Sequence, residues 1–454
     1  MSPDRPVARY LARHAEPEAA HADRLEGSYG HAVVVPAYGE TQSLFDTLGS
    51  VPRGPRGETL IVVVFNARAD SPPAVHEANR TSSARLAETA RSAREIAADP
   101  PISALAYPEG TVVAIDRAAP GRFLPEGQGV GLARKIGNDF VLRLRQGGRL
   151  AAPWILNTDA DTVLSNDAFD QLEKVESDRA AAIFFFEHRL SADPNVALAA
   201  RLYEISLRYY VLGLAWAGSP YAYEAMGSCI AVRPDAYAAV RGFPKKNAAE
   251  DFYVLDKLAK VGPIERLAGA PFLLEGRVSD RVPFGTGKAL SQLLEKRGAL
   301  QGFRLYHPLA FAHLAAWIRA MAAVARTGGR LEAALEELPR ENPFFRAELL
   351  VESLEKMGAF TALREAIARS GDGPTMLRHF HTWFDAFRAL KLIRALQAGG
   401  LPALAWREAL AEAPFTNLAA SSEDDPEHLR AALALEERRL AEGPAGVPPV
   451  VALG

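Results

Sequence analysis

HAVVVP (residues 31–36) and LIVVVF (residues 60–65) decide the fold, because both runs are apolar apart from His31 and are rich in β-branched side chains. A strand buried on both faces of a parallel sheet is a continuous apolar run, whereas a half-buried strand alternates polar and apolar residues. Three further apolar runs follow: TVVAI (111–115), PWIL (153–156) and AAIFFF (181–186). The segments between runs that favour helices are chiefly residues 40–50, 67–100 and 130–144. This alternation predicts an α/β fold with a doubly wound, mostly parallel sheet flanked by helices.

The composition is that of an ordinary folded protein, since 48% of the 454 residues are apolar and 24% are charged. These fractions exclude a disordered or collagen-like chain. Lysine and arginine number 52 and aspartate and glutamate number 55, so no basic excess is present to bind nucleic acid. Cys229 is the only cysteine, which excludes a disulfide framework and a cysteine zinc cluster and fits a cytoplasmic location.

Neither a signal peptide nor a transmembrane segment is expected. The first thirty residues carry many charges and contain no apolar core. Residues 209–220 form an apolar stretch that is too short for a bilayer, which needs about 20 residues. Residues 309–325 form a longer one, but it contains His313 and Arg319, which favours a packed helix.

The texture of the sequence changes near residue 290, where strand-like runs stop and leucine, alanine, glutamate and arginine dominate. We predict four parts: a lead-in (1–30), an α/β domain (31–290), a helical extension (291–440) and a loose tail (441–454). Phe384, Phe387, Leu390 and Ile393 are spaced three apart and are expected to share one helix face. Such a face needs a partner surface, which the α/β domain, a neighbouring helix or a second subunit in a homo-oligomer would supply.

The sharpest local signal is Asn157-Thr-Asp-Ala-Asp-Thr162, directly after the apolar run at 153–156. Alternate positions of an extended segment point the same way, so Asp159 and Asp161 are expected to place two carboxylates together at the end of a strand. Ligands of open α/β sheets bind at these strand ends, and a cation offsets the repulsion of paired carboxylates. Oxygen ligands suit magnesium or manganese. The alternative is an aspartate-rich surface turn.

Two glycine-containing segments offer further binding positions. VVVPAYGE (33–40) is a strand, a polar loop and a helix start, which suits a nucleotide but is also an ordinary strand–helix unit. GQGVGLARK (127–135) opens a helix, where backbone N–H groups favour anions and Arg134 and Lys135 offer charge-assisted contacts to phosphate. It matches neither a Walker loop nor a dinucleotide fingerprint, so a simple glycine-rich helix start is the alternative.

An acidic pair, Glu250-Asp251, opens the predicted helix that begins FYVLDKLAK. Acidic residues at a helix start stabilise the helix dipole, which is sufficient reason for their presence. The alternative is that the pair presents a general base to an acceptor hydroxyl. The sequence leaves both open.

Four segments in order resemble a known family: VVVPAYGE (33–40), GVGLARKIGND (129–139), NTDADT (157–162) and GSCIAVRPDAYAAVRGFPKKNAAED (227–251). Together, over about residues 30–290, they resemble a family 2 glycosyltransferase with the GT-A fold. The resemblance implies transfer of a sugar from a nucleotide diphosphate sugar, most often a UDP-sugar, to an acceptor, usually with inversion and with Mn²⁺ or Mg²⁺.

The resemblance also assigns roles to individual residues. Those expected to bind the donor are Pro36, Ala37, Tyr38, Glu40, Asn66, Arg134, Asp159 and Arg281. Asp159 and Asp161 would hold the metal, and Asp251, beside Glu250, would be the catalytic base. Asn66 stands where the family usually has an aspartate that contacts the base, and asparagine still offers an acceptor to a ring N–H. Arg281, together with Lys288, would contact the diphosphate from a glycine-containing loop.

Three other readings remain. The glutamine-, arginine- and tryptophan-containing motif of the processive synthases is missing near residue 280, which argues against a processive membrane enzyme. A nucleotidyltransferase usually has basic residues in a glycine-rich loop after its first strand, whereas AYGETQSL (37–44) has none. A catalytically inactive scaffold of the same fold is the third, and the acceptor is not specified by the sequence.

Overall fold

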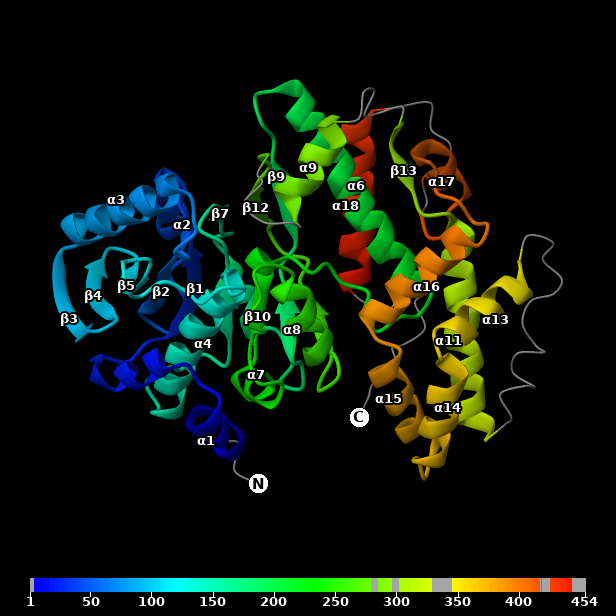
Figure 1. Ribbon diagram of the computed structural model, residues 1–454, viewed down its shortest axis with the longest axis horizontal. Coiled ribbons are helices and arrows are strands. Elements are labelled where there is room, and N and C mark those ends of the chain that lie inside the picture. The colour runs from blue at the N-terminus through cyan, green and yellow to red at the C-terminus, as the bar shows by residue number, and fades with distance from the viewer. Residues whose placement is uncertain are drawn as a thin grey trace. The chain divides into compact units, whose positions relative to one another are not determined.

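The computed structural model describes residues 4–278, 285–295, 302–328, 345–416, 418 and 425–442. The chain forms two compact units (Figure 1). Unit 1 consists of Met1–Ser191 and Ala225–Lys288, and unit 2 of Ala192–Glu224 and Ala289–Gly454. Unit 2 therefore combines a middle segment of the chain with its C-terminal part. The predicted tail overlaps residues 443–454, which lie outside the described residues.

Unit 1 is built on a nine-stranded sheet in the order β11-β8-β10-β6-β1-β2-β5-β4-β3. Its strands are β1 (His31–Ala37), β2 (Thr59–Asn66), β3 (Ser92–Ala98), β4 (Pro101–Tyr107), β5 (Gly110–Arg117), β6 (Ile155–Asn157), β8 (Ala181–Ile183), β10 (Ile230–Val232) and β11 (Ile264–Arg266). β6, β1, β2 and β5 are parallel neighbours, while β4 and β10 run antiparallel to the strands beside them. The predicted α/β class with a mostly parallel sheet is confirmed.

Helices cover both faces of this sheet. They are α1 (Asp4–Arg13), η1 (Pro17–Arg24), α2 (Gln42–Ser50), α3 (Pro73–Thr89), α4 (Val130–Gln146), α5 (Ala168–Glu173), η2 (Gly227–Cys229), α7 (Pro234–Ala239) and α8 (Glu250–Leu258). Figure 1 shows α3 and α4 on opposite sides of β1 and β2. β1 and β2 are buried along their whole length, as their continuous apolar runs predict. A second, small sheet has the order β7 (Thr162–Val163), β12 (Phe272–Glu275) and β9 (Phe186–Arg189).

The segment predicted as a helix over 67–100 is wrong in its second half. α3 ends at Thr89, and β3 and β4 then form an antiparallel hairpin at the edge of the sheet. β3 is mostly exposed, so it carries charged residues and alanine and lacks the apolar run of a buried strand. The run at 181–186 also divides, because β8 joins the large sheet and β9 joins the small one.

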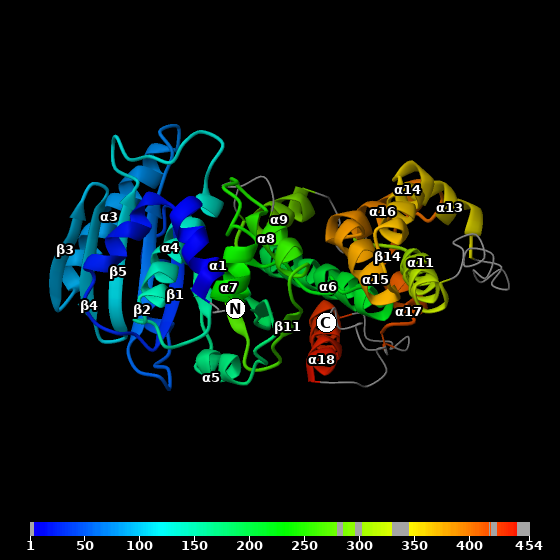
Figure 2. The same ribbon diagram turned by 90° about the horizontal axis from the view of Figure 1, so that it is seen from below.

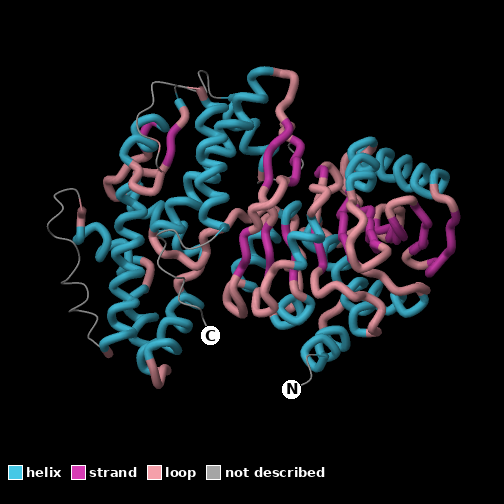
Figure 3. Tube along the Cα trace, turned by 180° about the vertical axis from the view of Figure 1, so that it is seen from behind, coloured by secondary structure: helices cyan, strands magenta, loops and turns pink. Residues whose placement is uncertain are grey.

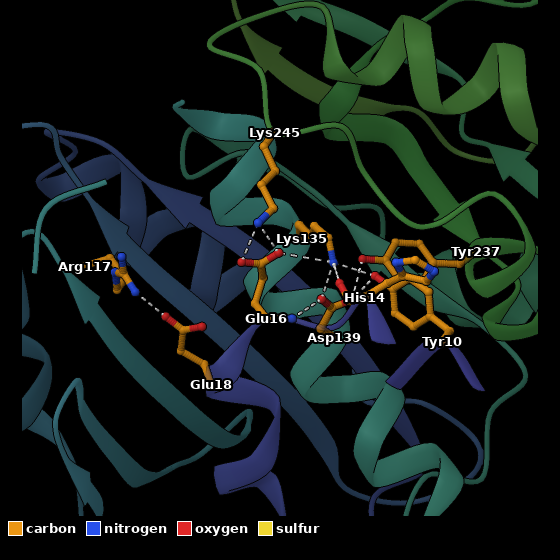
Figure 4. A network of polar contacts seen from close by, with 9 residues as sticks. All are labelled: Tyr10, His14, Glu16, Glu18, Arg117, Lys135, Asp139, Tyr237 and Lys245. Atoms are coloured by element: carbon orange, nitrogen blue, oxygen red, sulfur yellow. Dashed lines mark hydrogen bonds and ion pairs between the residues drawn. The ribbon is translucent and has the colours of Figure 1, made fainter. Parts of the chain in front are cut away.

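The N-terminal segment is fixed to α4 by a buried polar network (Figure 4). Asp139 accepts hydrogen bonds from the hydroxyls of Tyr10 and Tyr237 at 2.6 and 2.8 Å. It also accepts from the backbone N–H of Glu16 at 2.8 Å and from the Lys135 ammonium at 2.6 Å. Burial raises the pKa of both tyrosines, so their hydroxyls stay protonated and able to donate. Lys135 therefore supports the fold of unit 1, whereas its position at a glycine-rich helix start predicts a contact with phosphate.

Unit 2 is almost entirely helical, and nearly all strands belong to unit 1 (Figure 3). Its helices are α6 (Pro194–Trp216), α11 (Pro308–Thr327), α13 (Ala347–Lys356), α14 (Ala359–Ala368), α15 (Gly373–Trp383), α16 (Ala386–Ala398), α17 (Trp406–Glu412) and α18 (Pro426–Glu442). β13 (Arg304–Leu305) pairs with β14 (Leu404–Ala405), and α9 (Thr286–Glu295) contains the boundary between the units. Figure 2 shows α13 to α16 gathered around α11.

One described helix, α11, is long and apolar enough to cross a bilayer. Most of it is buried among other helices of unit 2, where the Trp317 ring packs edge-on against Phe380 and Phe384. The core helix of a globular unit has this pattern as well, because it is apolar on nearly all sides.

The predicted stripe on one helix face is wrong. Phe384 precedes α16 and is buried, whereas Phe387 is 53% exposed. Residues spaced three apart drift around a helix that turns every 3.6 residues, so the stripe rotates into solvent. The buried face of α16 instead contains Ala386, Ala389, Leu392, Ile393 and Leu396.

α6 and the C-terminal helix α18 are joined by ion pairs, of which those of Arg208 are buried. Arg208 contacts Glu204 at 3.3 Å and also binds Glu437 of α18. Arg430 of α18 reaches Glu204 at 3.2 Å, and Arg201 reaches Glu427 at 2.5 Å. A helix from the middle of the sequence is thus an integral part of the C-terminal helical unit.

Candidate active site

Polar side chains follow three parallel strands of unit 1 at the edge where these strands end. Tyr38 and Glu40 follow β1, Asn66 ends β2, and Asp159 and Asp161 follow β6. β1 lies between β2 and β6 and is parallel to both, so the three carboxyl ends meet at the same edge. The structure thus brings together five of the residues that the sequence analysis assigned to the site.

Pro36 and Ala37, which were expected to bind the donor, are the last two residues of β1, and both are buried. Proline is tolerated here because of the register of β1 against β6. The carbonyl of Val34 accepts from Thr158 N–H on the β6 side, and β6 pairs with Val33 and Val34 only. The missing N–H of Pro36 faces the same side, beyond the end of β6, so no ladder hydrogen bond is lost.

Asn66 is held in one orientation at the end of β2. Its Nδ2 donates to the carbonyls of Ala37 at 2.9 Å and Val64 at 3.2 Å. Turning the amide over would aim Oδ1 at two carbonyl oxygens, so Nδ2 stays in this place. No residue described by the structure donates to Oδ1, which leaves an acceptor at the carboxyl end of the central strands.

Arg134 of α4 connects the loop after β6 to the acidic pair at the start of α8. Its side chain is buried, with Nη2 2.5 Å from Asp159 Oδ1 and Nε 3.0 Å from Glu250 Oε1. Asn138, one turn further along α4, bonds Asn157 at 2.6 Å and fixes the helix against the end of β6. Two motifs that are far apart in the sequence thus share one guanidinium.

Asp251 is half-buried and is oriented by two backbone donors. Gly227 N–H donates to Oδ2 at 2.9 Å and Phe252 N–H to Oδ1 at 2.7 Å. Glycine at position 227 leaves room for the guanidinium, because a Cβ there would lie 2.5 Å from Arg134 Nη2. Burial, followed by the charge of Glu250, raises the pKa of Asp251 to about 7. A carboxyl with a pKa near neutrality is suited to accept a proton at physiological pH.

The turn before this pair adopts an unusual backbone conformation. Ala249 has φ of +60°, in the left-handed region that glycine normally occupies. Strained residues of this kind persist where the surrounding structure fixes them, and they cluster at functional sites. Burial also raises the pKa of the neighbouring Glu250, an effect that Arg134 opposes.

Asp161 lies in a second ion-pair group with Arg277 and Glu40. Arg277 Nη2 is 2.7 Å from Asp161 Oδ2 and also binds Glu40 Oε1. Asp159 and Asp161 were predicted to lie side by side on an extended segment. In the structure they do not, because a turn at 160–161 separates them. Thr162 N–H closes this turn on the carbonyl of Asp159 at 3.3 Å.

Among the described residues, the two groups contain five carboxyl groups and two arginines. The carboxyl groups are those of Glu40, Asp159, Asp161, Glu250 and Asp251, and the arginines are Arg134 and Arg277. Asp159 and Asp161 keep 39% and 24% of their side chains exposed, so their oxygens can be reached from solvent. Carboxylate oxygens that solvent can reach fit Mg²⁺ or Mn²⁺, which prefer hard oxygen ligands. Among the described residues no cluster of three or more candidate ligands is preassembled.

Arg277 was missed by the sequence analysis, which named Arg281 for the diphosphate. Arg281 lies outside the described residues, and Lys288 lies in α9. β12 pairs with β7 so that Leu274 lies opposite Thr162. Because the two strands are antiparallel, the residues after β12 lie beside Asp161. No local sequence signal distinguishes Arg277 from the arginines around it, because that pairing of distant strands decides its place.

No family model matches the sequence, and a search of curated proteins finds no match either. Among solved structures, the chain is similar to S. aureus TarS 1-349 in complex with UDP-GlcNAc, at 10% identity and a TM-score of 0.33, over 91% of this chain and 90% of that one. It is also similar to the mannosyltransferase PcManGT from Pyrobaculum calidifontis in complex with GDP-Man and Mn²⁺, at 16% identity and a TM-score of 0.30, over 87% and 94%.

Proposed function

We propose that the protein is a glycosyltransferase that transfers a sugar from a nucleotide diphosphate sugar to an acceptor with inversion, using a divalent metal. The observation that carries the proposal is the contact of Arg134 with both Asp159 and Glu250. This contact supports the proposal because Asp159 belongs to the predicted metal-binding segment and Glu250 precedes the predicted base, Asp251. We also propose that the protein has the GT-A fold and belongs to glycosyltransferase family 2, which its four ordered motifs resemble.

In the proposed reaction, Asp251 Oδ accepts the proton of an acceptor hydroxyl as that oxygen attacks the anomeric carbon. Gly227 and Phe252 N–H groups hold the carboxylate in one orientation while it does so. Asp159 and Asp161 would hold Mn²⁺ or Mg²⁺, which neutralises the leaving diphosphate when bound. Arg134 keeps Asp159 and Glu250 at fixed distances from each other, so it is a positioning residue.

We propose that the base of the donor nucleotide donates a hydrogen bond to Asn66 Oδ1. Uracil and guanine each present a ring N–H that such an atom can bind, whereas the corresponding nitrogen of cytosine has no hydrogen. A UDP-sugar is our first candidate and a GDP-sugar the second. Tyr38, whose hydroxyl donates to Ser71 Oγ at 3.2 Å, stands beside this position in the loop after β1.

A catalytically inactive scaffold is the main competing function. The raised pKa of Asp251 and its two backbone donors favour an enzyme, because a scaffold has no need of a base poised near neutrality. For unit 2 we propose a role toward the acceptor or in assembly of a homo-oligomer, since unit 1 contains all residues assigned to the donor.

The first prediction concerns the metal. UDP or GDP should raise the melting temperature of the protein much more with Mn²⁺ than with EDTA, because a ligand that binds only the folded state stabilises it. Asp161→Asn should remove most of this increment. Thermal unfolding followed by circular dichroism measures it.

The matched control is Asp170→Asn, an exposed aspartate of α5 that the site does not include. It should keep the wild-type increment. An Asp161→Asn protein whose nucleotide increment equals that of wild type would show that Asp161 is not a metal ligand.

The second prediction concerns pH. Asp251 accepts a proton only as the carboxylate, so kcat/KM for transfer should rise with pH through about 7. At pH 6 about one tenth of the wild-type maximum is expected, since a single group one unit below its pKa is about one tenth ionised. Nucleotide binding measured at the same pH values separates this effect from donor binding. A flat profile between pH 5.5 and 8 would contradict the assignment.

A further inference from the structure

Arg277 occupies the position where the carboxylates of two loops converge. A single nitrogen, Nη2, contacts both Glu40 Oε1 and Asp161 Oδ2, so the two oxygens converge on one point. Glu40 is 7% exposed and is further held by Ser43 Oγ at 2.6 Å, while the Arg277 side chain is 35% exposed. Glu40 is therefore anchored, and the arginine reaches both carboxylates from a position that is partly open to solvent.

We propose that Arg277 is an exchangeable cation of the donor site: it neutralises Glu40 and Asp161 in the free protein and turns to the donor diphosphate when a divalent ion takes over Asp161. This inference rests on the proposed function. Its physical reason is charge. The two carboxylates repel an incoming diphosphate, and an arginine that changes partner removes this repulsion before binding and supplies a bidentate phosphate contact afterwards.

The proposal gives Arg277 opposite effects on two ligands. In the free protein it competes with metal for Asp161, so metal alone should bind weakly. With nucleotide present it contacts the diphosphate, so metal and nucleotide should strengthen each other's binding. Couplings of this kind typically change an affinity by about 5–150-fold.

The test is binding of Mn²⁺ alone, followed by electron paramagnetic resonance, and binding of UDP or GDP at saturating Mn²⁺, followed by calorimetry. Arg277→Ala should bind Mn²⁺ alone about 5-fold more tightly than wild type and the nucleotide at least about 5-fold more weakly. Arg277→Lys keeps the charge but not the fork of donors, so both of its affinities should lie between those of wild type and Arg277→Ala. Arg189→Ala is the matched control, since Arg189 pairs with Glu275 near the same loop at 3.7 Å and should change neither affinity.

A purely structural role for Arg277 predicts that both affinities weaken together, and that result would overturn the inference. Unchanged Mn²⁺ affinity in Arg277→Ala, with nucleotide still bound by the wild type, would overturn it as well while leaving the proposed function intact. A wild-type protein that binds neither UDP nor GDP with Mn²⁺ would instead contradict the proposed function. Circular dichroism spectra of both Arg277 variants establish that each is folded.

Discussion

Replacing Asp251 by asparagine is expected to lower the rate of sugar transfer by about 10²–10⁴-fold, the usual contribution of a general base. The amide keeps the shape of the side chain and its hydrogen bond from Gly227 N–H, but it cannot take up a proton. Binding of UDP or GDP with Mn²⁺ should stay within about twofold of wild type, because the donor residues are unchanged. Single-turnover transfer to the acceptor, together with the nucleotide-dependent melting shift, measures both quantities.

The same variant should be more stable than wild type at pH 8. The pKa of Asp251 is raised in the folded protein, so the folded state holds this proton more tightly than the unfolded chain does. Stability is therefore lost as pH rises from the ordinary aspartate range through about 7, and asparagine avoids that loss. Asp256→Asn, in the same helix and paired with Lys260 at 2.8 Å, controls for general effects on α8 and should retain transfer. Near-normal turnover in Asp251→Asn would show that the residue only stabilises the helix start.

Replacing Asp139 by alanine is expected to reduce the free energy of unfolding by about 3–5 kcal/mol, the range for breaking a buried ion pair by removing one partner. Its two carboxylate oxygens accept from Tyr10, Tyr237, Lys135 and the backbone of Glu16. Alanine leaves all four donors without this acceptor in a buried place, and each must regain a partner or bear the cost of desolvation. Urea denaturation followed by circular dichroism measures the change.

Asp23→Ala is the matched control for this variant. Asp23 pairs with Arg143 of the same helix α4 at 2.6 Å, but both side chains are about half exposed. Exposed pairs contribute about 0–1 kcal/mol, so this variant should unfold close to wild type. Equal stabilities of the Asp139→Ala and Asp23→Ala proteins would mean that the network in Figure 4 does not fix the N-terminal segment.

The sequence by itself determined the centre of the fold. β1 and β2 appear as predicted because a strand buried on both faces is apolar at most positions, and that requirement is written in consecutive residues. β5 also appears as predicted, although it is only partly buried. Asp159 and Asp161 were predictably placed after a strand, and Glu250 and Asp251 at a helix start, because the pattern of neighbouring residues defines where each strand or helix ends or begins.

The tertiary structure alone decided which of these residues meet. Arg134 and Glu250 are separated by 116 positions, as are Arg277 and Asp161, and no pattern of a few residues encodes such pairings. The exposed edge strand β3 and the assignment of α6 to unit 2 were missed because their sequences carry ordinary helical or mixed composition. Local sequence fixes how a segment is buried, whereas the packing of distant segments fixes which charges neutralise one another.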